Sequence, residues 1–127
     1  MAELWALRDG LYLAIQLGIN FLEVELDAKV IVEMLNSTNC SNRKYSPILH
    51  DCRFLLSRLM QARVVHVFRE TNKCAYFLAR RGCSIRENFV IFDAPPSIDL
   101  VNLLVLDVNG RSDLRLVAMT LASMASL

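Results

Sequence analysis

The sequence predicts an α/β fold in which helices pack on a parallel sheet. Residues 21–26 alternate between apolar and acidic side chains, and residues 64–68 are rich in β-branched ones, which predicts a strand at each place. Segments with apolar residues at helical spacing stand before, between and after these strands. Helical connections allow strands to run parallel. The order helix, strand, helix, helix, strand, helix therefore indicates a sheet flanked by helices.

The length and composition of the chain suit one folded domain. Its 127 residues are enough for one hydrophobic core, and a content of 54% hydrophobic and 21% charged residues is not typical of disorder. The sequence contains neither a run of about 18 apolar residues nor the basic-then-apolar order of a signal peptide. We therefore expect no membrane association and an intracellular location, nuclear or cytoplasmic and not secreted. The four cysteines form no C-x-x-C pair, which favours reduced thiols buried as small apolar groups.

The first helix is predicted over residues 2–17, because apolar residues recur there at helical spacing and Gly18 follows in the usual place of a C-terminal cap. These apolar residues are Leu4, Leu7, Leu11, Ala14 and Ile15. In the strand at 21–26, the aliphatic side chains point to one face and the glutamates to the other. The two sets are Leu22, Val24 and Leu26, and Glu23 and Glu25.

Two helices are predicted between the strands. Asp27 ends the first strand and is a candidate N-cap for a helix at residues 28–35. The apolar stripe predicted for that helix consists of Val30, Ile31, Met34 and Leu35. After a polar, turn-like stretch at 36–44, Ser46 and Pro47 form a typical helix start. The buried face predicted for this helix consists of Ile48, Cys52, Leu55, Leu56 and Leu59.

The last helix of the pattern follows the strand at 64–68. Thr71 or Asn72 is expected to cap it, and Gly82 to end it. Its inward residues are predicted to be Cys74, Ala75, Leu78 and Ala79. Because the pattern weakens beyond this helix, we divide the chain into a folded domain at residues 1–84 and a partly irregular C-terminal extension at residues 85–127.

The predicted sheet needs a further partner, because two strands alone are marginally stable and leave exposed edges. Residues 103–108 of the extension fit a late strand or an irregular apolar strip. Either this strip pairs with the first strand, or a piece of the domain precedes Met1.

Charge is segregated along the chain, although the net charge is only +1. Residues 41–86 contain ten Lys and Arg against two acidic residues, whereas the segments on either side carry more acids than bases. A basic stretch of this kind suits binding to a phosphate backbone. It fits equally well with solvated helix faces whose charges pair with the acidic ends.

Three segments carry a recognisable pattern. Residues 2–11 read AELWALRDGL, residues 24–27 read VELD, and residues 66–79 read HVFRETNKCAYFLA. In this order and at about this spacing, they resemble the first helix, a strand that ends in a catalytic aspartate, and the last strand and helix of one family. This family comprises the plant ribonuclease H like, reverse-transcriptase-like domains related to non-LTR retrotransposons. The resemblance covers about residues 2–83.

The resemblance implies a ribonuclease H like fold, a mixed sheet flanked by helices, whose first strands come before the segment present here. Members of the family hydrolyse the RNA strand of RNA–DNA hybrids with two Mg²⁺ ions held by four carboxylates. Glu3 matches the helix glutamate and Asp27 the strand-end aspartate, so both are candidate catalytic and metal-binding residues. Tyr76 stands where the last helix has its aspartate, and a neutral phenol is a poor ligand for Mg²⁺. The first-strand aspartate has no counterpart in this chain.

Other roles for these residues stay open. Without the resemblance, Glu3 fits a first-turn acid favoured by the helix dipole, and Asp27 fits a simple N-cap. Arg69, Asn72 and Lys73 lie at the strand-to-helix junction beside the inferred site. There they either contact the phosphates of a nucleic acid or serve capping and solvation.

We therefore expect a nucleic-acid-binding domain of ribonuclease H type. Its expected partner is an RNA–DNA hybrid or double-stranded RNA, the cofactor of its family is Mg²⁺, and we expect little or no hydrolysis by this chain. One alternative is a non-catalytic interaction domain for protein or nucleic acid. The other is a decayed fragment derived from a transposon.

Overall fold

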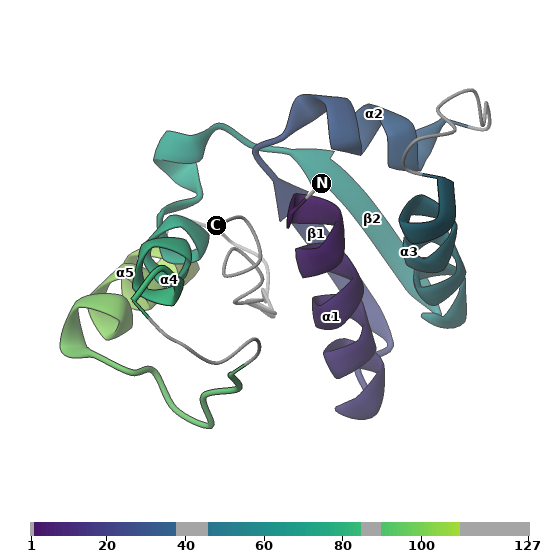
Figure 1. Cartoon of the computed structure of the whole chain (residues 1–127). Helices are drawn as coiled ribbons and strands as arrows, with labels where there is room; N and C mark the ends of the chain where they lie inside the picture. The colour runs from purple at the N-terminus through teal and green to yellow at the C-terminus, as the bar shows by residue number, and fades with distance from the viewer. Residues whose placement is uncertain (1, 38–45, 85–89, 110–127) are drawn as a thin grey trace.

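The computed structural model describes residues 2–37, 46–84 and 90–109, and Figure 1 shows how their helices and strands are arranged. In chain order the elements are α1 (Ala2–Gln16), β1 (Phe21–Leu26), α2 (Lys29–Asn36), α3 (Ser46–Arg58), β2 (Gln61–His66), the 3-10 helix η2 (Arg69–Thr71), α4 (Lys73–Gly82) and α5 (Ile98–Asn109). The predicted α/β order is confirmed through α4. Most of the predicted turn at 36–44 lies outside the described residues.

The two strands form a parallel pair, as predicted from the helices between them. Val24 of β1 lies opposite Val64 of β2. The second strand occupies Gln61–His66 rather than the predicted 64–68. Pairing with the other strand segment determines where it begins, because the Gln61 N–H donates to the carbonyl oxygen of Asn20, just before β1, at 3.0 Å. The β-branched run was therefore a poor guide to the ends of this strand.

The main hydrophobic core lies between one face of the sheet and helices α1, α2 and α3. The sheet contributes Leu22, Val24, Leu26, Ala62 and Val64, which confirms the predicted apolar face of β1. The predicted buried residues of α1 and α3 also belong to this core, with Leu49 in addition. After α1 the chain turns at Gly18, whose φ of +75° lies in the left-handed region that glycine adopts at little cost.

The start of α2 differs from the prediction. Its N-cap position is Ala28 and no side chain caps the helix, so the prediction that Asp27 is the N-cap is wrong. The buried face is also shifted, because the helix packs on β2 and α3. Its buried residues are Ile31, Val32 and Leu35, whereas Val30 is exposed. The carboxylate of Asp27 is thereby left for contacts outside α2.

A second hydrophobic cluster joins α4 to α5. Leu100 of α5 is 2% exposed and packs with Cys74 and Leu78 of α4. The prediction of a strand or irregular strip at 103–108 is wrong, because these residues belong to α5. The residues of α5 that meet α4 are Leu100, Leu103 and Leu104, a helical spacing that begins before the predicted strip. The strip therefore packs on α4 and does not pair with β1. Each helix in the described ranges is too short or too polar to cross a lipid bilayer.

Candidate functional site

The topology brings three of the predicted segments to one end of the sheet. Because β1 and β2 run parallel, Asp27 after β1 and Arg69 after β2 leave the sheet at the same end. Helix α1 runs in the opposite direction to β1, so α1 begins near the point where β1 ends (Figure 1). Glu3, in the first turn of α1, is therefore placed at this end as well. We call this region the carboxyl-end corner, after the carboxyl ends of the two strands.

Asp27 and Arg69 form the central contact of the corner. The Nε–H of Arg69 donates to Oδ2 of Asp27 at 3.2 Å, which joins residues far apart in the sequence. The side chain of Asp27 is 33% exposed, and that of Arg69 is 68% exposed. The pair is thus open to solvent, and its contribution to stability is small, at most about 1 kcal/mol. Its importance lies in where it holds the guanidinium group.

The same guanidinium lies beside Tyr76 in α4. The Cζ atom of Arg69 is 5.7 Å from the centre of the Tyr76 ring, and that of Arg80 is 5.9 Å from it. Cations at this distance are attracted by the electrons of the ring face. Tyr76 is 45% exposed, so the ring and both cations are accessible from outside. The structure therefore brings Asp27 and Tyr76 to the same guanidinium.

The other predicted residues lie around this contact. Asn72 occupies the N-cap position of α4, as predicted, but its side chain makes no capping bond. Thr71, the alternative cap, donates instead to the carbonyl oxygen of Phe68, the N-cap residue of η2, at 2.8 Å. Lys73 is exposed in the first turn of α4, and Glu3 is exposed in the first turn of α1.

Lys73, Tyr76 and Arg80 form an exposed stripe on α4. Their spacing of three and then four residues places them on one face of the helix, and all three are exposed. Arg80 was counted in the basic stretch of the sequence but was not predicted as a site residue. Its position four residues after Tyr76 in a predicted helix was the available signal. We call Arg69 together with Lys73, Tyr76 and Arg80 the basic stripe.

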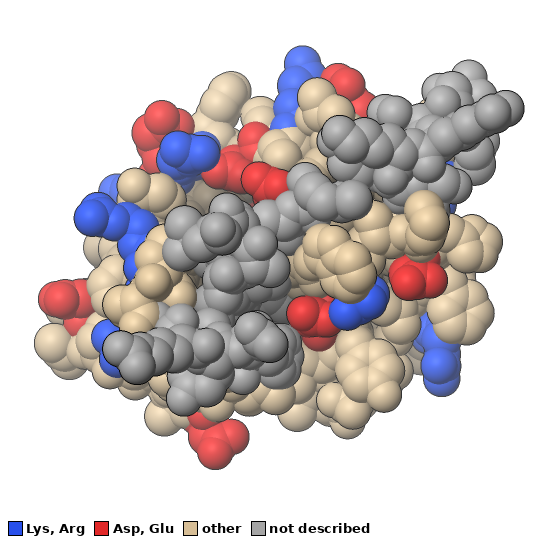
Figure 2. All heavy atoms as spheres, viewed as in Figure 1, with Lys and Arg blue, Asp and Glu red and all other residues tan. Residues whose placement is uncertain are grey.

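The rest of the basic stretch is partly structural. Arg53 of α3 donates to the carbonyl oxygens of Met34 and Ser37 at the end of α2. Arg63 forms an ion pair with Glu23, its direct neighbour across the sheet. In Figure 2, Lys and Arg atoms gather over η2 and α4, with acidic atoms beside them near the end of β1. The ion pair of Arg63 fits the interpretation in which the basic stretch pairs with the acidic ends, whereas binding of the stretch to phosphates stays a prediction.

The side chains at the carboxyl-end corner form a poor set of ligands for Mg²⁺. Two divalent ions require several clustered carboxylates. Within residues 2–37, 46–84 and 90–109, no group of three or more Asp, Glu, His or Cys side chains could hold a metal ion. A cation at Asp27 would compete with Arg69 for the carboxylate. The residues present therefore do not fit the two-ion site that the sequence resemblance implied.

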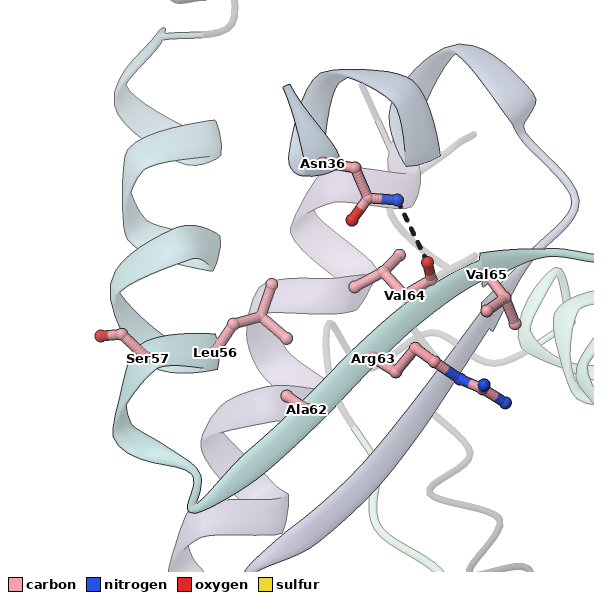
Figure 3. Close-up of a pocket in the computed structure, with 7 residues that line it drawn as sticks. All are labelled: Asn36, Leu56, Ser57, Ala62, Arg63, Val64 and Val65. Carbon is pink, nitrogen blue, oxygen red and sulfur yellow. Dashed lines mark hydrogen bonds between the residues drawn. The ribbon is translucent and has the colours of Figure 1, made fainter. Parts of the chain in front are cut away.

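A hollow of the surface lies elsewhere. It measures about 560 Å³ and lies against β2 (Figure 3). Its lining residues are Asn36, Leu56, Ser57, Ala62, Arg63, Val64 and Val65. The side-chain amide of Asn36 donates to the Val64 carbonyl oxygen at 3.2 Å and so pairs a backbone group at the outer edge of β2. None of the predicted site residues lines this hollow.

The described cysteines differ in exposure. Cys52 is fully buried and donates its S–H to the Leu4 carbonyl oxygen at 3.4 Å. Burial, followed by repulsion from Asp51, raises the pKa of the Cys52 thiol to about 12. Burial also raises the pKa of Cys74. Cys83 is exposed, so the prediction of a buried thiol is wrong there, and Cys40 lies outside the described residues.

Comparisons with known proteins identify relatives of this chain. The family described as "Reverse transcriptase-like" matches residues 1–82, which include all elements from α1 to α4. An Arabidopsis thaliana protein named "Putative ribonuclease H protein" is 35% identical over 95 residues. The matched part is 75% of this chain but only 15% of that relative. No solved structure gives a significant match.

Proposed function

Because this chain belongs to the reverse transcriptase-like family and is a ribonuclease H like domain, we propose that it binds nucleic acid through its basic stripe. The ligand we propose is an RNA–DNA hybrid or double-stranded RNA. The observation that carries the proposal is the position of Arg69, which is held at the end of the sheet by Asp27 and beside Tyr76. Glu3 and Asp27, the candidate catalytic residues that the sequence resemblance implies, belong to the same end of the sheet. An intracellular location, in a compartment where such duplexes occur, is part of the proposal.

Three cationic side chains of the stripe support binding to phosphates. Arg69, Lys73 and Arg80 are exposed, and the amino end of α4 adds the partial positive charge of a helix N-terminus. Phosphate contacts by Lys and Arg release counterions from the duplex, so binding weakens as the salt concentration rises. The plant and retrotransposon-related origin that the sequence resemblance implied belongs to the same proposal, and the Arabidopsis relative supports the plant part.

Binding is tested by titrating the chain into a fluorescently labelled RNA–DNA hybrid at several salt concentrations. The logarithm of the association constant should fall linearly with the logarithm of the salt concentration. Arg69→Gln should reduce the steepness of that fall by about 1, the contribution of one phosphate contact. Arg58→Gln is the matched control, because Arg58 is exposed in the last turn of α3, at the opposite end of the sheet. Absent or salt-insensitive binding would contradict the proposal and favour the alternative, a domain that binds a protein partner.

We also propose that this chain has little or no hydrolytic activity towards the hybrid. Glu3 and Asp27 are two of the four carboxylates of the family site, and the Asp27 carboxylate accepts from Arg69. The test is the release of labelled RNA from a hybrid incubated with Mg²⁺ or Mn²⁺. We expect no release above that of a sample without protein. Robust cleavage that Asp27→Asn abolishes would overturn this part of the proposal.

A further inference from the structure

We infer that the guanidinium group of Arg69 takes the place of a divalent cation at the carboxyl-end corner, which makes it a metal-independent site for the phosphodiester backbone. The inference rests on the proposed function and specifies how the ligand is held. It concerns one ligand chemistry, the charged phosphate oxygens of a duplex.

Asp27 brings a negative charge to the corner. A carboxylate repels phosphate and therefore needs a cation between itself and a nucleic acid. In this chain the cation is Arg69, whose Nε–H bonds Oδ2 of Asp27 at 3.2 Å. A guanidinium has five N–H donors, and this bond uses only the one on Nε. The terminal nitrogens can therefore donate to phosphate oxygens while Asp27 holds the side chain, a geometry that suits guanidinium groups.

A ring stands at position 76, where the sequence resemblance implies a carboxylate. An aspartate at position 76 would add a second negative charge and favour a metal ion at the corner. The neutral ring of Tyr76 does the opposite, because it attracts Arg69 and Arg80 to its faces at 5.7 and 5.9 Å. Each exposed cation–π contact contributes only about 0.5–1 kcal/mol. That is enough to favour one position of a long, otherwise mobile side chain.

The basic stripe extends along α4. Lys73 and Arg80 lie seven residues apart on the same exposed face of α4, a rise of about 10 Å along the helix axis. Arg69 adds a third cation beside Tyr76, near the middle of the stripe. The stripe can therefore contact more than one phosphate, and it binds the backbone rather than a base sequence.

The first experiment measures metal binding without nucleic acid. Mn²⁺ is titrated into the protein, and free Mn²⁺ is followed by electron paramagnetic resonance. The wild type should leave Mn²⁺ free, whereas the double variant Arg69→Gln, Tyr76→Asp should bind it at least about tenfold more tightly. Circular dichroism checks that the variant is folded, and Arg69→Gln alone should give an intermediate result. Stoichiometric binding by the wild type that Asp27→Asn abolishes would overturn the inference.

The second experiment measures hybrid binding with Mg²⁺ and with EDTA. The affinity should be the same in both buffers within about twofold, and Arg69→Gln should lower it about tenfold in both. Tyr76→Phe keeps the ring and should bind like the wild type, whereas Tyr76→Asp should bind more weakly. Arg58→Gln again serves as the control. Binding that requires Mg²⁺ would overturn this inference alone, whereas no binding in either buffer would overturn the proposed function itself.

Discussion

Asp27 has a role that depends on the charge around it. In a metal site its carboxylate would attract the substrate indirectly, through a bound cation. Here the carboxylate accepts a hydrogen bond from Arg69, and its negative charge partly offsets the attraction of that guanidinium for phosphate. A metal site and a guanidinium site therefore predict opposite effects on hybrid binding when the charge of Asp27 is removed.

Asp27→Asn should leave hybrid binding unchanged or strengthen it by up to about fivefold. The asparagine carbonyl oxygen still accepts from Arg69, while the negative charge is gone. The affinity is measured by fluorescence anisotropy at low salt, with Arg58→Gln as the control. A marked loss of affinity in Asp27→Asn would show that the carboxylate itself holds the ligand, through a metal ion.

Cys52 gives a second prediction at the residue scale. Its ordinary pKa is 9.0, and in the folded chain burial raises the pKa to about 12. Between these values the folded state keeps the proton while the unfolded state loses it. The contribution of this thiol to the free energy of unfolding should therefore be constant well below pH 9 and fall as the pH rises through 9 towards 12.

Urea unfolding across this pH range measures the effect. Cys52→Ala removes the thiol and should make the fall of the unfolding free energy with pH shallower. It also lowers stability at neutral pH by leaving a small cavity. Cys83→Ala removes an exposed thiol and should leave the decline as in the wild type. Equal declines in the wild type and in Cys52→Ala would contradict the assignment to this thiol.

At the scale of elements, α4 depends on α5 for its buried face. Leu100 fills the space between the two helices together with Cys74 and Leu78. Leu100→Ala should therefore destabilise this pair by about 2–5 kcal/mol, as for other buried leucines. Amide hydrogen exchange should become faster in α4 and α5 and stay unchanged in α1 and α3, whose core is separate. Leu106→Ala, at an exposed leucine of the same helix, is the control, and equal effects of both substitutions would contradict this packing.

The sequence predicted the existence and order of the elements better than their ends. Strong helical spacing and the alternation of β1 were sufficient for α1 to α4, because each pattern directly reflects a buried face. The start of β2 depends on pairing with Asn20 and is not visible in a local window. Helix α5 had a local signal, the helical spacing of Leu100, Leu103 and Leu104, but that spacing begins before the apolar strip that was considered. The same limit applied to the site. Asp27 and Arg69 were each predicted near it, but their contact, and that of Arg80 with Tyr76, arises only from the folded arrangement.

At the scale of the whole molecule, one hydrophobic cluster serves mainly stability and the other serves the proposed binding site. The larger cluster fixes the sheet and helices α1 to α3, while the smaller one positions α4 and thus the basic stripe. The chain should therefore unfold in a cooperative transition when heated, as followed by circular dichroism at a helix-sensitive wavelength. A gradual loss of signal without a transition would contradict a packed core and favour a decayed fragment.

The central claim is that a duplex binds to the basic stripe at the carboxyl-end corner. It is tested most directly by adding an RNA–DNA hybrid to isotope-labelled protein in EDTA and mapping the changes in amide chemical shift. We predict the largest changes in η2, in the first two turns of α4 and at Asp27, with none around the hollow beside β2. Changes centred on that hollow, or no changes without added Mg²⁺, would contradict the claim.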